Sequence, residues 1–258
     1  MRHIVALLTA VAASLALAVP AQGITFGQVD TTNRFSNVGA AVFESEPGTK
    51  DILCSGTLIA PRVFLTAGHC TAYLESQGID DIWVTFDPSF DAASPLIHGT
   101  YYTHPLFGSG GRSNTYDLAV VVLDAPATGI TPASLPTAGQ LDRMDLKRQR
   151  FTAVGYGTIR DDKTNGPHSL IPPDGWRRYA DQGFRSLTNA WLNLSMNPST
   201  GSGGTCYGDS GGPHFLAGTN TVVSVTVTGD RFCRATDVTY RLDTPYARSF
   251  LDDFVTLP

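Results

Sequence analysis

The sequence predicts an all-β protein built from antiparallel strands. Short runs rich in β-branched residues recur along the chain, and Gly, Pro, Asp and Asn separate them. Between these runs the pattern shows no crossover helices of the kind that a parallel α/β sheet requires. With 258 residues, 42% hydrophobic and 16% charged, the chain is long enough for one large or two small domains with a sizeable core. The predicted fold class is therefore an antiparallel barrel or sandwich.

The first residues are typical of a secretory signal peptide. Arg2 and His3 precede an apolar run of about 16 residues that ends at Val19, and small residues and Pro20 follow. A bilayer requires roughly 20 apolar residues, so the run predicts a cleaved signal, residues 1–23, rather than a membrane span. We expect a secreted protein that has no membrane association once the signal is removed. The formal charge of −5, without a long run of either sign, argues against nucleic-acid binding.

Strand-like runs follow in both halves of the chain, at residues 38–43, 52–59, 63–67, 82–86, 118–123, 151–156, 184–194 and 222–228. Residues 125–150 contain three prolines and a charged piece and predict an interdomain linker, which divides the mature chain into residues 24–136 and 137–258.

The end of the chain predicts a helix. Thr244 and Pro245 are typical of a helix start, with a capping residue followed by proline at the first helical position. Tyr246, Phe250 and Phe254 then recur at helical spacing. We expect a C-terminal helix that packs this aromatic face on the body of the protein.

Four cysteines in an exported chain favour two disulfides over a metal site. Three pairings are open, of which Cys54 with Cys70 and Cys206 with Cys233 are the local closures. A Cys-x-x-Cys zinc pattern is absent from the sequence, and no metal-binding spacing connects its histidines, among them His98, His104, His168 and His214. We therefore expect no metal and no cofactor.

The stretch from Gly204 to Pro213 places one serine among residues suited to nucleophilic attack. Ser210 is the candidate nucleophile. Glycines such as Gly208 and Gly211 allow a tight turn that directs amide hydrogens at a developing oxyanion. Serine alone is a weak nucleophile, so a base and an orienting acid must lie elsewhere in the chain.

His69 and Asp117 are the candidates for the base and the acid. His69 follows an apolar strand run and is adjacent to Cys70, so that a disulfide would hold its backbone. We expect it on a short turn next to the strand. Histidine is a natural base because an unperturbed imidazole, with a pKa of about 6.5, takes and returns a proton near neutrality. Asp117 begins the most apolar strand of the mature chain, and there it could fix the tautomer of His69.

Together these motifs resemble the trypsin/chymotrypsin-like serine peptidase family. The matching stretches are Leu65-Thr-Ala-Gly-His-Cys70, Tyr116-Asp-Leu-Ala-Val120 and Gly208-Asp-Ser-Gly-Gly-Pro213, and they occur in the family's order. The resemblance extends from about residue 24 to the C-terminal helix. It implies two six-stranded antiparallel β-barrels with the active site between them. The first barrel would carry the histidine and the aspartate, and the second barrel the serine.

The resemblance implies a serine endopeptidase that works through an acyl-enzyme. Ser210 would attack the peptide carbonyl, His69 would move the proton, and the backbone amides of Gly208 and Ser210 would bind the oxyanion. Protein or peptide substrates follow from this activity, with proteinaceous inhibitors as candidate partners. We expect the protein to be a monomer.

An activation device follows from the same resemblance. In relatives a free N-terminal Ile or Val inserts its ammonium beside the aspartate that precedes the nucleophile, here Asp209. The stretch beginning at Ile24 is similar to the inserting end, but Ala21-Gln22-Gly23 precedes it in place of an arginine-terminated propeptide. We expect export processing to expose Ile24 and to yield an active enzyme.

The resemblance also indicates a specificity pocket. Counting back from the nucleophile places Gly204 at the floor of this pocket, followed by Thr205, so the aspartate of trypsin-like members is missing there. The pocket wall is matched either by residues 224–226 or, with better spacing to the last cysteine, by a stretch that contains Thr228 and Gly229.

Asp237 is a further candidate for the pocket. Counting back from Arg241, which resembles a family arginine near the end of the last strand, places Asp237 on the inner wall, where a carboxylate could bind Lys or Arg. The alternative is a loop residue that points to solvent.

Two other functions remain open at this stage. Residues 208–212 also satisfy Gly-x-Ser-x-Gly, the pattern of a secreted esterase of the α/β-hydrolase class, but only His214 follows the serine and the helical crossovers are missing. The second alternative is a catalytically silent binding module of the same fold, because the pocket departs from the family pattern.

Overall fold

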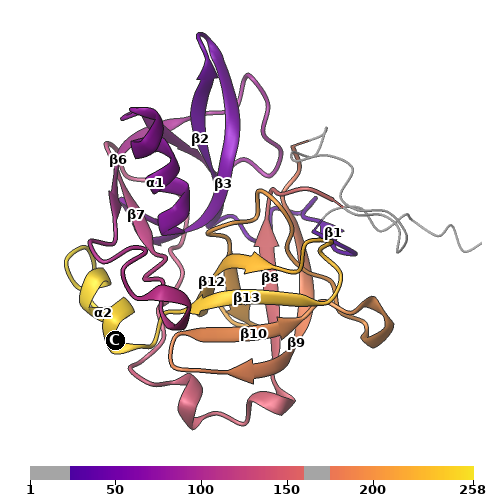
Figure 1. Cartoon of the computed structure of the whole chain (residues 1–258). Helices are drawn as coiled ribbons and strands as arrows, with labels where there is room; N and C mark the ends of the chain where they lie inside the picture. The colour runs from indigo at the N-terminus through magenta and orange to yellow at the C-terminus, as the bar shows by residue number, and fades with distance from the viewer. Residues whose placement is uncertain (1–23, 160–174) are drawn as a thin grey trace, which may run out of the picture.

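The computed structural model describes residues 24–159 and 175–258, and its strands form two closed antiparallel barrels (Figure 1). This confirms the predicted fold class. The predicted signal peptide lies outside the described residues. In the first barrel the strands follow the order β2-β3-β4-β7-β6-β5, and β2 pairs with β5 to close it. These strands are β2 (Val38–Glu46), β3 (Thr49–Ala60), β4 (Val63–Thr66), β5 (Ile82–Thr85), β6 (Ile97–Thr103) and β7 (Ala119–Leu123).

The second barrel repeats the order of the first, β8-β9-β10-β13-β12-β11, and β11 pairs with β8 to close it. These strands are β8 (Arg150–Gly155), β9 (Arg178–Leu187), β10 (Trp191–Ser195), β11 (Pro213–Leu216), β12 (Val222–Gly229) and β13 (Thr236–Arg241). A short strand, β1 (Gln28–Val29), joins the outer side of β9. Residues 28–29, which belong to the predicted first domain 24–136, thus pair with a strand of the second barrel.

All pairings between these strands are antiparallel. The α/β-hydrolase fold requires a parallel sheet, so this architecture contradicts the esterase alternative. The largest apolar cluster lies where the two barrels meet and includes Leu65 and Val120 of the first barrel with Phe215 and Tyr240 of the second. This contact fixes the relative position of the loops that carry the site.

Two α-helices are described, α1 (Gly68–Gln77) and α2 (Pro245–Leu251), with short 3₁₀ turns at Gly111–Ser113, Leu141–Arg143, Leu146–Arg148 and Pro198–Thr200. Helix α2 is the predicted C-terminal helix. Thr244 caps it by accepting a hydrogen bond from the amide of Ala247 at 3.3 Å. The ring of Phe250 packs against His104 of the first barrel, 4.9 Å between centroids. Tyr246 departs from the expected buried stripe because its side chain is largely exposed.

Three local predictions need correction. His69 lies in the first turn of α1 and not on a short turn, because a ten-residue helix begins directly after β4. The run 184–194 is not one strand: β9 ends at Leu187, the amide of Thr188 donates to the carbonyl of Trp191 at 2.8 Å, and β10 returns alongside. The runs 97–103, 213–216 and 236–241 are strands that were not expected, because polar or ring-bearing residues interrupt their apolar alternation.

Candidate active site

The first barrel supplies His69 and Asp117 in direct contact. Nδ1 of His69 lies 3.0 Å from Oδ2 of Asp117, and the backbone amide of His69 donates to Oδ1 of the same carboxylate at 2.8 Å. The carboxylate is almost fully buried, with 6% of its side chain exposed, whereas 35% of the His69 side chain remains exposed. One aspartate therefore fixes both the backbone and the ring of the histidine, which leaves Nε2 directed away from the pair.

The disulfides are the two local closures, Cys54–Cys70 and Cys206–Cys233. The first joins β3 to α1 at the residue after His69 and so holds the helix end that carries the histidine. Cys54, His69 and Cys70 have the residue types of a metal site, but both sulfur atoms are consumed by the disulfide and offer no thiolate.

Ser210 lies on the loop between β10 and β11 and lines the same pocket as His69. Within the described residues no hydrogen bond joins its hydroxyl to the histidine ring. Its backbone is held by the first barrel, because the carbonyl of Ser210 accepts from the amide of Ser55 at 2.9 Å. The hydroxyl of Ser55 also donates to the carbonyl of Gly208 at 3.1 Å and accepts from the amide of Tyr156 at 3.0 Å. Ser55 is a positioning residue that sequence reasoning missed.

The glycines of this loop adopt backbone angles that other residues rarely adopt. Gly208 has φ of 93° and Gly211 has φ of 76°, and a Cβ on Gly211 would lie 2.1 Å from the hydroxyl oxygen of Thr66. Among the described residues none accepts a hydrogen bond from the amide of Gly208 or Ser210, whereas the amide of the intervening Asp209 donates to Cys206. This pair of free amides is the arrangement that an oxyanion site requires.

Asp209 is fully buried and faces the second barrel. Its two oxygens accept from the amides of Gly157 and Cys206, both at 2.8 Å. Burial raises the pKa of Asp209 to about 7, although the two amides and Arg178 act in the opposite direction. A buried carboxylate that accepts from two backbone amides, and that forms no ion pair with any of the described residues, is suited to receive a cation.

Ile24 is also buried, in an apolar cluster with Ala153 of β8 and Ala180 of β9. Two residues further along this strand, a Cβ on Gly155 would lie 2.2 Å from Oδ1 of Asp209. Residues i and i+2 of a strand share one face about 7 Å apart, so Ile24 and Asp209 occupy the same face of β8. The carbonyl of Thr25 accepts from the amide of Gly204 at 2.9 Å. This bond ties the start of the described chain to the loop that carries Ser210, residues 196–212, which we call the nucleophile loop.

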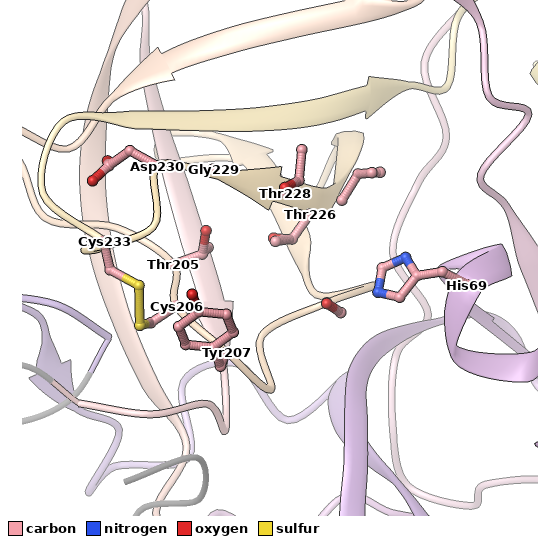
Figure 2. Close-up of a pocket in the computed structure, with 11 residues that line it drawn as sticks. His69, Thr205, Cys206, Tyr207, Thr226, Thr228, Gly229, Asp230 and Cys233 are labelled. Atoms are coloured by element: carbon pink, nitrogen blue, oxygen red, sulfur yellow. A yellow bond between two sulfur atoms is a disulfide. The ribbon is translucent and has the colours of Figure 1, made fainter. Parts of the chain in front are cut away.

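A pocket of about 270 Å³ extends from the candidate catalytic residues into the second barrel (Figure 2). Figure 2 shows His69 at one end of the view and the Cys206–Cys233 disulfide at the other, with threonine side chains between them. Of the expected pocket residues Thr205, Thr228 and Gly229 line it, together with His69, Ser210, Cys206, Tyr207, Thr226, Val227, Asp230 and Cys233.

Gly204 and Asp237 do not line this pocket, which corrects two of the predicted positions. The side chain of Asp237 turns into the interior of the second barrel, where its Oδ2 lies 3.0 Å from Nε2 of His214 and accepts from Nε2 of Gln182 at 2.8 Å. All three side chains are fully buried. A Cβ on Gly204 would lie 2.5 Å from the same Gln182 nitrogen, so Gly204 leaves room for this buried cluster behind the pocket.

The His214–Asp237–Gln182 cluster was not predicted, because its members come from three different strands that only barrel closure brings together. One further polar atom of each residue, Nδ1 of His214, Oδ1 of Asp237 and Oε1 of Gln182, has no hydrogen-bond partner in the described structure. Buried polar atoms without hydrogen-bond partners raise the free energy of the native state and so lower its stability.

The fold and this constellation define the class of chymotrypsin-like serine proteases. The family model described as Trypsin matches residues 24–250, and the chain belongs to this family. Human chymotrypsin-like elastase family member 3B is 30% identical over 172 residues, which cover 62% of this chain and 60% of that protein. Bovine proproteinase E is 29% identical over 174 residues, which cover 62% of this chain and 64% of that protein. The chain thus spans less than two thirds of the length of these curated relatives.

Solved structures show the same fold. HL collagenase superposes with a TM-score of 0.69 at 16% identity, covering 89% of this chain and 98% of that chain. Neuropsin from mouse brain superposes with a TM-score of 0.67 at 19% identity, covering 89% and 99%. No helix among the described residues is both long and apolar enough to cross a membrane.

Proposed function

We propose that this protein is an exported serine endopeptidase. Ser210 attacks the carbonyl of a peptide bond, His69 takes the serine proton through Nε2 and returns it to the leaving amine, and Asp117 holds the ring in the required tautomer. The acyl-enzyme on Ser210 is then released by water. The observation that carries this proposal is that His69, whose ring contacts Asp117, lines the same pocket as Ser210.

The oxyanion of the tetrahedral intermediate is stabilised by the amides of Gly208 and Ser210. Both are unused by the described fold, and both lie on a loop that Ser55 holds from the first barrel. Donors that are fixed before the reaction stabilise the developing charge without a cost of reorganisation. Exported protein or peptide chains are the substrates of such a site.

Activation requires a free α-amino group at Ile24 in this proposal. Freed from residues 1–23, the ammonium of Ile24 pairs with the buried carboxylate of Asp209, and this pair holds the nucleophile loop in its active shape. Ile24 is already buried on the face of β8 against which the side chain of Asp209 packs. Sequencing the N-terminus of the secreted, active protein tests the step, and a start well upstream or downstream of Ile24 refutes it.

Peptide turnover and labelling by a fluorophosphonate test the activity. Ser210→Ala should abolish labelling and lower kcat by at least about 10⁴-fold, because the nucleophile is lost. Ser199→Ala, at an exposed serine on the 3₁₀ turn Pro198–Thr200, is the matched control and should change neither reading. Wild-type protein with a verified N-terminus at Ile24 that neither reacts nor cleaves would favour a silent binding module instead.

A further inference from the structure

The loop from Asp230 to Ala235 connects β12 to β13 and forms one wall of the pocket. We call residues 230–235 the wall loop. Gly229, Asp230 and Cys233 line the pocket from this side, and Figure 2 shows them on the strand end and loop that face Thr205 and Tyr207. The shape of the pocket therefore depends on the conformation of a loop that contains no helix or strand of its own.

The side chain of Asp230 organises this loop. Its Oδ1 accepts from the amides of Phe232 and Arg234, both at 3.2 Å, and its Oδ2 accepts from the amides of Arg234, Ala235 and Thr236 at 3.0, 2.7 and 3.0 Å. The amide between them, that of Cys233, donates to the backbone carbonyl of Asp230 at 2.9 Å. The five consecutive backbone amides of residues 232–236 thus all donate hydrogen bonds to Asp230.

These contacts favour the ionised carboxylate. Burial raises the pKa of Asp230, but the hydrogen bonds from Thr236, Ala235, Arg234 and Phe232 outweigh it, so that its pKa lies below the usual range. Charge-assisted hydrogen bonds of this kind are stronger than neutral ones. The loop also contains Cys233 at φ of 52°, a left-handed conformation that costs free energy and persists only where neighbours enforce it.

Two further links attach the wall loop to the nucleophile loop. The Cys206–Cys233 disulfide joins them covalently, and the hydroxyl of Tyr207 donates to the carbonyl of Arg231 at 3.2 Å. Tyr207 is the residue before Gly208, so the loop that supplies the oxyanion amides and the wall of the pocket are held together. Displacement of one loop would displace the other.

A direct role of Asp230 in binding a cationic side chain is disfavoured by this arrangement. A carboxylate has about four lone-pair sites, and five contacts from backbone amides already use those of Asp230. The inner surface of the pocket carries instead the side chains of Thr205, Thr226 and Thr228.

We propose that Asp230 is a positioning residue that holds the wall loop in a preformed shape against the substrate side chain at the cleaved position. This role rests on the proposed endopeptidase activity. A preformed wall spares the entropy that ordering a mobile loop would cost at each binding event. Asp230 acts through the loop and does not touch the reacting atoms, so its loss should weaken binding of side chains that fill the pocket more than it slows the chemical steps.

Asp230→Asn tests the proposal, because the variant keeps the size of the side chain but replaces one acceptor oxygen with a donor. For peptides with a large side chain at the cleaved position, we expect KM to rise about tenfold or more, with kcat changed less than threefold. For peptides with glycine or alanine there, and for labelling by a small alkyl fluorophosphonate, the change should stay below threefold. Hydrogen exchange of the amides of residues 232–236 should accelerate together.

Asp91→Asn is the matched control. Asp91 also accepts a backbone amide, that of Ala93 at 2.8 Å, in an exposed loop outside the pocket, and its variant should retain wild-type kinetics. A uniform fall in kcat and in the labelling rate for Asp230→Asn would show a general structural defect and overturn the proposal. An unchanged KM in Asp230→Asn, although hydrogen exchange of the loop amides accelerates, would overturn the proposal as well. A wild-type protein that the fluorophosphonate does not label counts against the proposed function. Amides of residues 232–236 that stay protected from exchange in Asp230→Asn count against the proposed role of Asp230.

Discussion

The barrel of β2 to β7 is filled by apolar side chains, whereas the barrel of β8 to β13, with the same strand order, also encloses ionisable groups. The buried polar residues on the strands of the first barrel are hydroxyl-bearing, namely Ser55, Thr57, Thr66 and Thr85. The strands of the second barrel bury Gln182, His214 and Asp237 behind the pocket, and Arg178 and Arg241 besides. Similar topology thus supports two kinds of interior.

This difference matches a division of tasks. The first barrel presents the His69–Asp117 pair on a rigid apolar body, and the second surrounds the pocket and the nucleophile loop. Apolar burial stabilises a fold without demanding partners, while each buried polar group must find one or raise the free energy of the native state. The second barrel should therefore respond more sharply to the loss of a single partner and to pH.

The largest expected effect is that of Asp237→Ala on stability. The substitution removes the acceptor of His214 and Gln182 and should lower the free energy of unfolding by about 3–5 kcal/mol, because both buried side chains are left without this partner. The urea midpoint measures the loss, with the substitution made in Ser210→Ala protein so that the proposed peptidase activity cannot degrade the sample. Leu58→Ala in the first barrel should cost about 2–5 kcal/mol through its cavity.

The joint replacement of the cluster distinguishes the two interiors. Changing Gln182, His214 and Asp237 together to leucine removes all the polar side-chain groups of this cluster. The free energy of unfolding should then return to within about 2 kcal/mol of that of the parent protein. In the first barrel, cavities from Leu58→Ala and Phe64→Ala should accumulate without any such recovery. A triple variant as unstable as Asp237→Ala alone would contradict the contrast.

Removing either disulfide should cost about 3 kcal/mol of stability, since the closed loops span 16 and 27 residues and loop entropy depends only weakly on length. The kinetic effects should differ. Without Cys54–Cys70 the helix end that carries His69 loosens and kcat should fall. Without Cys206–Cys233 the pocket wall loosens and KM should rise. Paired serine variants assayed on one peptide series measure both, and the same kinetic change in both variants would refute the division of tasks.

The pH dependence of stability should arise in the second barrel. In the chain still joined to residues before Ile24, the pKa of Asp209 is raised to about 7 from 3.8, so folding favours its protonated form. This stabilisation is complete below about pH 4 and is lost as pH rises to 7, by about 1.4 kcal/mol for each pH unit within that window. Asp209→Asn should remove the dependence, which urea midpoints at pH 5 and 7 measure.

A free Ile24 ammonium changes the sign of this prediction. Its positive charge beside Asp209 lowers the pKa of the carboxyl, so stability should then be retained as pH rises through the neutral range. Comparing the unprocessed and processed forms of the Ser210→Ala protein tests this. Equal pH profiles for the two forms would contradict the pairing of Ile24 with Asp209.

The comparison also shows what the sequence could reveal. Strands such as β4 and β7 were predicted because they are short, nearly continuous apolar runs with β-branched residues, and the motifs around His69, Asp117 and Ser210 are short enough to be read locally. Helix α1 was missed because its buried face is Gly68, Cys70, Thr71 and Leu74, which hardly resembles an apolar stripe.

Contacts between distant strands could not be predicted. Gln182 and Asp237 are 55 residues apart and meet only when β9 and β13 both line the closed second barrel. The spacing from Arg241 located Asp237 along the chain but could not predict the direction of its side chain. In the closed barrel this side chain points toward His214. Ser55 was missed for a similar reason, since its partners Gly208 and Tyr156 belong to the other barrel.

The smallest expected effect concerns the surface of the first barrel. His98 lies between Asp124, 2.6 Å from Nδ1, and Asp81, 3.1 Å from Nε2, and the hydrogen bond to Asp124 raises the pKa of the histidine. Stability from this ion pair is present below about pH 6.5 and is lost as pH rises through the raised pKa. The side chain is 39% exposed, so solvent screening should keep the effect of His98→Gln below about 1 kcal/mol at pH 5.5.

Salt separates this surface effect from the buried one. The difference between His98→Gln and the parent should shrink at 1 M salt and vanish at pH 9, because screened and uncharged groups no longer attract. The loss caused by Asp237→Ala should persist at 1 M salt, since the side chains of Asp237 and His214 are fully buried and salt does not screen them. Melting temperatures of the two variants at low and high salt measure the distinction. A His98→Gln loss as large and as insensitive to salt as that of Asp237→Ala would show that the first barrel also depends on its charges.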